Sequence, residues 1–184
     1  AQAAALNTDQ LAAIETGDIR FISTSALRAL SSTQLDGLTS DQLRALSSTQ
    51  INALTTGQVS TLNTDDLNSF SSDQFNKLST AQVAALTTAQ LSHLTTDSLN
   101  AMGSAQFATL SSTQVGALTS DQLPTMETAD LRAVTTAALR GLSSDQVGAL
   151  ASDAVGSMST AQIGSLGTAQ IQGLTTGDMV ALTS

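Results

Sequence analysis

Large apolar residues recur every eight positions along the chain, in two interleaved series. Leu38 and Leu46 belong to one series, and Leu43 belongs to the other. Neither series shifts in register, so the 184 residues make 23 whole octads. A fixed short period is typical of a repeat architecture, in which each unit packs against its neighbours. The sequence therefore predicts a single repeat array over residues 1–184, with no separate capping domains.

Each octad fits a very short helix. The unit reads x-Gln-[Leu/Ile/Val]-x-[Ala/Gly]-Leu-[Ser/Thr]-[Ser/Thr], and its two large apolar residues, such as Leu43 and Leu46, are three apart on one helical face. A hydroxyl precedes each expected helix, where it can cap an unpaired amide N–H. Either of the two hydroxyl columns can supply the N-cap, and the stricter use of serine and threonine in the second column favours that one. The first column offers a Ser-x-x-Gln capping box, as from Ser47 to Gln50.

The charged residues are sorted along each octad in the sense that a helix dipole favours. All 15 acids except Asp36 lie just before the expected N-cap or in the first two places after it, as Asp41 does. The five arginines, for example Arg44, all lie two places after the glutamine position. Acids near the start of a helix and bases further along are the stable arrangement. This sorting favours helices over strands.

One continuous helix is excluded, because eight residues turn an α-helix by about 800° and the apolar pair would drift around all faces. The sequence therefore predicts an all-α solenoid, or superhelix, of one- to two-turn helices. A β-solenoid is the structural alternative. Apolar spacings of three and five are odd and would alternate between the faces of a sheet, which disfavours it.

Composition narrows the function classes. The net charge is -9, aromatic residues make up 2% of the chain, and cysteine is absent. Nucleic-acid binding lacks the basic surface and stacking residues that it uses, and anionic membrane surfaces are disfavoured for the same reason. No apolar run approaches the ~20 residues of a transmembrane helix, so no membrane insertion is expected. Disulfides and thiolate metal sites are excluded.

Candidate chemistry is sparse. His93 is the single histidine, and the densest acid pair, Asp65 with Asp66, lacks the spacing of a calcium loop. We therefore predict no catalytic, cofactor-binding or metal-ligating residues, no cofactor, and a protein that is not an enzyme. Pro124 should distort its octad, and Phe21 marks a local irregularity. The variable positions, which hold Ala, Arg, Asp, Asn, Ser, Gly and Gln, are expected to form no sustained patch.

The glutamine column predicts a ladder of side-chain amides that bond between adjacent octads. Aspartate replaces glutamine at four positions, which indicates that an oxygen acceptor is the needed part of the side chain. These positions are Asp18, Asp66, Asp130 and Asp178.

The runs LSTAQVAALTTAQLSHLTTDSL and LSSTQVGALTSDQL resemble the Ala-Leu-Thr-Thr-x-Gln-Val/Leu tracts of large, repetitive, adhesin-like proteins of proteobacteria, which are secreted or surface-associated. The resemblance covers the entire chain. It implies an exported structural role, outside the cell or at the surface of a bacterium, and carries no catalytic residues.

The predicted function is a structural one: a non-catalytic rod, stalk or head-to-tail filament. The first octad, AQAAALNT, and the last, GDMVALTS, keep the apolar pattern, so both ends should expose interior surface. Either the chain is a slice of a longer array, or copies stack head to tail, and we expect end-to-end self-association. The first alternative is a solenoid scaffold that binds a protein or glycan partner. The second is an ice-binding array of hydroxyls.

Overall fold

The computed structural model describes residues 5–182, and in this range the chain is helical and contains no strand. The prediction of an all-α repeat fold is confirmed. In chain order the elements are α1 Thr8–Ala12, α2 Thr16–Ile19, α3 Thr24–Arg28, α4 Ser32–Asp36, α5 Ser40–Ala45, α6 Ser48–Ala53, α7 Thr56–Thr61, α8 Thr64–Asn68, α9 Ser72–Asn76, α10 Thr80–Ala84, α11 Thr88–Ser92, α12 Thr96–Asn100, α13 Ser104–Phe107, α14 Ser112–Val115, the 3-10 helix η2 Leu123–Thr125, α15 Thr128–Ala133, α16 Thr136–Leu139, α17 Ser144–Gly148, α18 Ser152–Gly156, α19 Thr160–Ser165, α20 Thr168–Gly173 and α21 Thr176–Ala181.

A capping box starts most of these helices. The Ser47 backbone is extended, its hydroxyl accepts a hydrogen bond from the Gln50 N–H, and Gln50 Oε1 accepts one from the Ser47 N–H at 2.8 Å. Ser48 is thus the first helical residue, and the stricter hydroxyl column is not the N-cap. The favoured cap register was wrong, because only the first column stands three residues before the glutamine that completes the box.

Several helices, among them α5, α19 and α20, end directly at an apolar residue with extended backbone. Leu46 closes α5 with φ -61° and ψ 137°, and Thr39, before the same helix, has φ -72° and ψ 156°. No residue between 5 and 182 has a positive φ, so these short helices end without the left-handed glycine that often terminates a helix. A helix of about five residues is unstable alone, and its neighbours must hold it.

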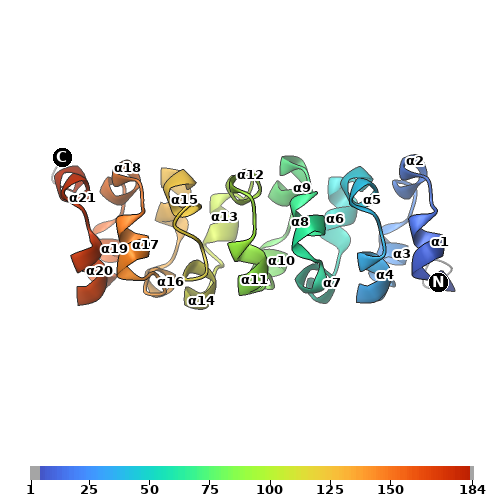
Figure 1. Cartoon of the computed structure of the whole chain (residues 1–184), viewed down its shortest axis with the longest axis horizontal. Coiled ribbons are helices and arrows are strands. Elements are labelled where there is room, and N and C mark those ends of the chain that lie inside the picture. Colours follow the sequence, from blue (N-terminus) through green and yellow to red (C-terminus); the bar gives the residue numbers. More distant parts are fainter. Residues whose placement is uncertain (1–4, 183–184) are drawn as a thin grey trace. The chain divides into compact units, whose positions relative to one another are not determined.

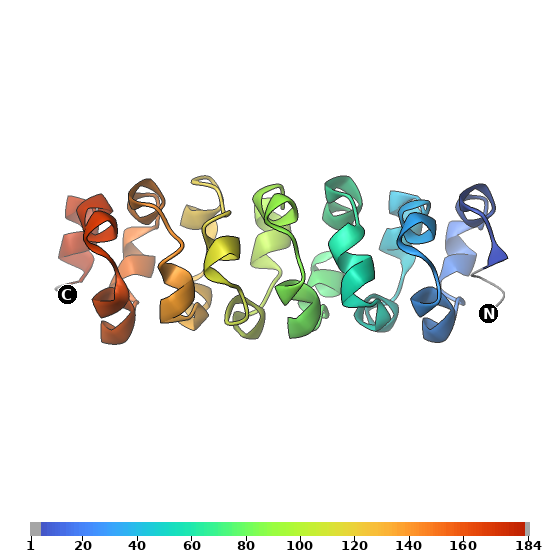
Figure 2. The ribbon, with the colours of Figure 1, turned by 90° about the horizontal axis from the view of Figure 1, so that it is seen from below.

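The chain forms two compact units, Ala1–Leu86 and Thr87–Ser184. Within each unit the chain winds in a coil, and α-helices that start about 24 residues apart along the sequence pack against each other. Thus α2 packs against α5 in the first unit and α18 against α21 in the second (Figures 1 and 2). The repeat thereby forms an α-solenoid, in which a turn of the coil takes between three and four octads.

Both apolar series line the interior of the coil. Leu43 is fully buried and Leu46 is 3% exposed, and the same values recur in octad after octad. Phe70 belongs to the series of Leu46 and Phe75 to that of Leu43, and their rings meet edge to face with centroids 5.9 Å apart. The two predicted apolar series therefore form the observed core, except near the ends of the described range, where members such as Ile171 and Met179 are exposed.

Two glycines permit an unusually close approach of helices in the second unit. A Cβ atom on Gly173 of α20 would overlap the carbonyl oxygen of Ser144 in α17, and one on Gly148 would lie 2.7 Å from the Gly173 carbonyl oxygen. The same arrangement joins Gly141 to Ser112, between α16 and α14. Since neither glycine has a positive φ, these residues are needed for their lack of a side chain.

We expect Gly173→Ala to lower the free energy of unfolding by about 1–3 kcal/mol, because α17 and α20 must move apart to admit the methyl group. Gly164→Ala is the matched control. Nothing lies within 4 Å of the Cβ position of Gly164 in α19, so alanine should stabilise that helix by about 0.5–1 kcal/mol. Urea denaturation followed by circular dichroism measures both variants, and equal effects would contradict the close approach.

Candidate functional site

The glutamine side chains join successive turns of the coil. In α5, Gln42 Oε1 accepts the N–H of Thr39, while its amide nitrogen donates to the carbonyl oxygens of Leu11 at 2.9 Å, Ala12 at 3.2 Å and Ile14 at 2.7 Å. These carbonyls lie 28 to 31 residues earlier, at the end of α1. One amide therefore caps its own helix and also satisfies the carbonyl end of the helix on the preceding turn.

The same pattern recurs in both units. Gln82 bonds to the carbonyls of Ile51 and Leu54, and Gln162 to those of Leu131 and Val134. The predicted ladder of amides between adjacent octads was wrong in its partners. Helix ends present unpaired carbonyl groups, and these attract the amide N–H groups more directly than a second amide would. Three to four octads, rather than one, separate the partners.

Aspartate changes this contact where it replaces glutamine. Asp66 of α8 accepts from the Ser40 hydroxyl at 3.0 Å and from the Asn63 amide at 2.6 Å. Asp130 of α15 accepts from the Ser104 hydroxyl at 2.7 Å. In both cases the serine stands 26 residues before the aspartate. A hydroxyl from the preceding turn thus donates to a side chain that cannot itself donate to the carbonyls.

Asp178 of α21 is the third buried member of this set, and it is fully buried. Its Oδ2 atom accepts from the Thr175 N–H and the Thr175 hydroxyl, each at 2.8 Å, as a glutamine Oε1 would. Its Oδ1 atom is buried and has no hydrogen-bond partner among the described residues. The sequence predicts that the glutamine position of the octad needs an oxygen acceptor, and Asp178 supplies one to Thr175. Asp18, which occupies the same octad position, is exposed.

Burial raises the pKa of Asp66 and of Asp130 above the usual range. Loss of solvation is the main cause at both, and hydrogen bonds from Ser40 and Asn63 at Asp66, and from Ser104 at Asp130, oppose it. Nearby acids add to the rise: Asp36 and Asp65 at the first, and Glu127 at the second. The folded chain therefore holds these two protons more tightly than the unfolded chain.

A group with a raised folded-state pKa stabilises the fold most below its unfolded-state pKa, here near 3.8, and this contribution is lost as pH rises through the folded-state pKa. We expect Asp66→Asn/Asp130→Asn to reduce the loss of melting temperature between pH 4 and neutral pH. Ser40→Ala should enlarge that loss, because it removes a hydrogen bond to the charged form. Parallel profiles for the parent chain and the double variant would contradict this assignment.

Exposed acids gather on one side of the coil in the first unit. Asp41 in α5 and Asp65 in α8 occupy the second helical position of two helices that pack together. Asp9 and Asp73 lie four helices before and after α5, and hence on the same side. The equivalent position of the other helices in this unit is uncharged: Gly17, Ser25, Thr33, Thr49, Gly57 and Ala81.

The second unit repeats this arrangement. Its exposed acids at the same octad position are Asp97, Asp121, Asp145 and Asp153, and Asp121, which precedes η2, lies 24 residues from Asp97 and from Asp145. The expectation of no sustained patch is therefore corrected. The acids are irregular along the sequence, but they align once the coil brings octads three and four apart to the same side.

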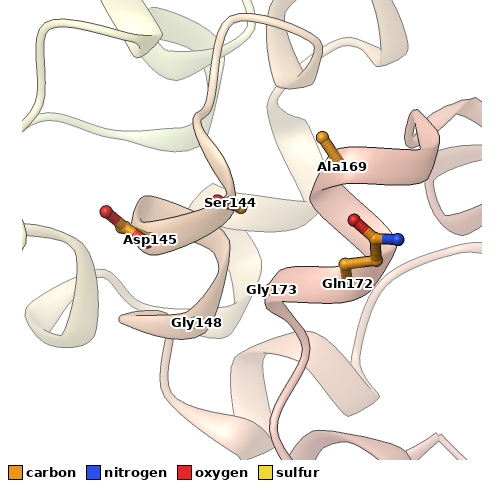
Figure 3. A pocket seen from close by; sticks show the side chains of 6 residues that line it. All are labelled: Ser144, Asp145, Gly148, Ala169, Gln172 and Gly173. Atoms are coloured by element: carbon orange, nitrogen blue, oxygen red, sulfur yellow. The ribbon is translucent and has the colours of Figure 1, made fainter.

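A surface depression of about 520 Å³ lies between α17 and α20. Ser144, Asp145, Gly148, Ala169, Gln172 and Gly173 line it. Figure 3 shows that the Asp145 and Gln172 side chains point away from each other rather than toward a common point. The depression follows from the missing side chains of the two glycines.

The remaining singled-out residues have local roles. His93 is exposed, and its Nδ1 atom lies 2.8 Å from the carbonyl oxygen of Ala89 in its own helix. Pro124 lies in the 3-10 helix η2 instead of an α-helix, as the missing N–H predicts. Phe21, just after the four-residue helix α2, is 79% exposed.

Between residues 5 and 182, no three histidine or acidic side chains come together as ligands for a metal ion. The helices of the same part are each too short and too polar to cross a bilayer.

Short capped helices, a continuous apolar interior and turn-to-turn glutamine bonds define an α-solenoid repeat protein. The sequence matches the model of the ALTTAQ repeat in six overlapping stretches, residues 11–46, 42–64, 59–96, 92–128, 123–160 and 155–184. The chain belongs to the ALTTAQ repeat family. A search of curated proteins finds no match.

Proposed function

We propose that the chain is a structural, non-catalytic repeat segment that forms a rod, stalk or head-to-tail filament at the surface of a bacterium or outside the cell. The observation that carries this proposal is the use of the recurring side chains. Leucine and glutamine hold one turn of the coil to the next, and the capping hydroxyl fixes the start of its own helix. A chain built in this way gains length and stability from every added octad.

The two faces at the ends of the described range support assembly of copies. In the second unit Ile171 is 42% exposed and Met179 is 52% exposed, although earlier members of their series, such as Val155, are fully buried by the following turn. In the first unit Gln10 is exposed, and Leu6 is only half-buried. The face of the second unit therefore offers apolar side chains and helix carbonyls. The face of the first unit offers the Gln10 amide and side chains of the apolar series that includes Leu6.

Within each unit, one turn of the coil contacts the next through surfaces that are equivalent to these two faces. We therefore expect copies of the chain to associate head to tail, with Gln10 of one copy near the last carbonyls of another. Analytical ultracentrifugation across a concentration range tests this, and negative-stain microscopy distinguishes filaments from closed particles. The mean mass should rise with concentration.

Ile171→Asp/Met179→Asp should keep the chain monomeric, because it places charges on the apolar face. Phe21→Asp is the control, since it changes an exposed aromatic residue outside both apolar series. A parent chain that stays monomeric at every concentration, or equal assembly of the parent and the Ile171/Met179 variant, would rule out head-to-tail association.

A binding scaffold is the second candidate, and the acidic side of each coil favours it. The chemistry of that side suits a protein partner with a basic surface. Binding of a lysine-rich peptide should weaken with salt and should be reduced by Asp41→Asn/Asp73→Asn. The buried pair Asp66→Asn/Asp130→Asn alters the net charge equally and serves as the control. Equal loss in both variants would reveal an effect of net charge alone.

A further inference from the structure

The glutamine amides mark a point at which several backbone carbonyl oxygens converge. In α19 the Gln162 amide nitrogen lies 3.0 Å from the carbonyl oxygen of Leu131, 3.2 Å from that of Arg132 and 2.9 Å from that of Val134. In α20 the Gln170 nitrogen lies 2.7 Å and 2.8 Å from two carbonyl oxygens. Each turn therefore builds a small cluster of acceptors around one donor group.

A glutamine amide elsewhere contacts the carbonyls that stand 31, 30 and 28 residues earlier. For Asp178 these are the carbonyls of Val147, Gly148 and Leu150. Within residues 5–182, the Leu150 carbonyl receives no hydrogen bond. The carbonyl of Val147 receives only N–H groups of its own helix end, among them that of Leu150 at 3.2 Å. Aspartate is one methylene shorter than glutamine and offers no N–H, so the point that an amide nitrogen fills elsewhere has no donor here.

The Asp178 carboxylate faces this point. Its Oδ2 atom accepts the Thr175 N–H in place of a glutamine Oε1, so Oδ1 lies on the side where the amide nitrogen of a glutamine would be. Asp178 is fully buried, and Oδ1 has no partner among the described residues. An unpaired carboxylate oxygen beside acceptor carbonyls in a buried site is strongly unfavourable without a compensating positive group.

We propose that a monovalent metal cation, K⁺ or Na⁺, binds between the Asp178 carboxylate and the carbonyl oxygens at the end of α17. Hard cations take oxygen ligands, and carbonyl oxygens can replace their water shell. A single carboxylate carries one negative charge, so a monovalent ion neutralises the site, whereas a divalent ion would leave one positive charge buried. A water molecule can donate to only two acceptors and leaves the charge in place.

Asp178 differs from the other buried aspartates in its contact with the serine that stands 26 residues earlier. At Asp66 and Asp130 the serine 26 residues earlier donates to Oδ1. Ser152 occupies that position for Asp178 and lies close to α21, since its hydroxyl oxygen would be 3.0 Å from a Cβ on Gly177. The Ser152 hydroxyl does not donate to Asp178, which leaves it able to act as a further oxygen ligand.

Amide hydrogen exchange of α21 in the full chain tests the proposal. The parent chain is compared in KCl, NaCl and choline chloride at equal ionic strength and pH, because choline is too large for the site. A cation present at about twice its dissociation constant slows exchange through local opening about threefold. We expect that slowing in KCl or NaCl relative to choline, whether or not copies assemble, because the comparison is made at a dilution that keeps the chain monomeric.

Asp178→Gln supplies the missing amide and is the matched variant. It should be protected in all three salts to the level that the parent reaches with its preferred metal cation. Exchange in the parent that is equal in the three salts would overturn the proposal, as would a salt response that persists in Asp178→Gln. Protection that appears in choline chloride only after Ca²⁺ is added, or that changes when the pH of all three salts is varied but not with the cation, would overturn it as well.

Discussion

We expect Gln82→Glu to lower the free energy of unfolding by about 3–5 kcal/mol at neutral pH. Gln82 is 2% exposed, and its amide nitrogen donates to the carbonyl oxygens of Ile51, Asn52 and Leu54. Glutamate keeps the shape and the acceptor that caps the helix, but it turns a donor into a charged acceptor among carbonyls. Urea denaturation at neutral pH measures the loss.

The pH dependence of that variant identifies the cause. Burial raises the pKa of a carboxyl group, and a protonated glutamate can again donate to a carbonyl, so the loss should shrink as pH falls. Gln10→Glu is the control, because Gln10 is exposed and forms the same capping box with Asn7. It should change the free energy by less than about 0.5 kcal/mol. A similar loss in both variants would place the effect in the helix cap and not between turns.

Phe75→Ala should cost about 3–5 kcal/mol, since it removes a large buried side chain and leaves a cavity. Phe75 is fully buried and meets Phe70 edge to face. In a repeat array the damage should be local at first, so hydrogen exchange in α6 and α9, which pack together, should speed up before that in distant octads.

Phe21→Ala is the control for Phe75, because the Phe21 ring is 79% exposed. Its removal should change the melting temperature little. Comparable destabilisation by the two substitutions would mean that Phe21 contributes to the core as much as Phe75 does.

Much of this fold can be predicted from the sequence, because the features of each octad depend on residues that are close together in the chain. The spacing of Leu43 and Leu46 predicts one helical face, and the sorting of Asp41 and Arg44 along the octad favours a helix over a strand. These features depend on contacts within a few residues, and the structure has them as predicted. Pro124 breaks its helix for an equally local reason.

The cap register was missed because two hydroxyl columns stand side by side and both can cap. The stricter usage of serine and threonine favoured the second column. The deciding signal was the glutamine three residues after the first column, which closes the box in both directions, as between Ser47 and Gln50.

The candidate sites depend on a number that the sequence does not contain, the number of octads in one turn of the coil. That number pairs Gln42 with carbonyls 28 to 31 residues away, places Ser40 beside Asp66, and aligns Asp41 with Asp65. It is set by how closely helices pack, which in turn depends on side-chain volumes throughout the interior.

The sequence by itself determined the octad, its helical state, its apolar face and the need for neighbours. The tertiary structure alone decided which octads are neighbours. Because the octad is repeated with little variation, every octad has the same local preferences. Contacts within an octad therefore cannot decide whether it packs against the next octad or the third one along the chain. Only the packing of whole turns selects the partners, and with them the buried position of Asp178 and the acidic side of each coil.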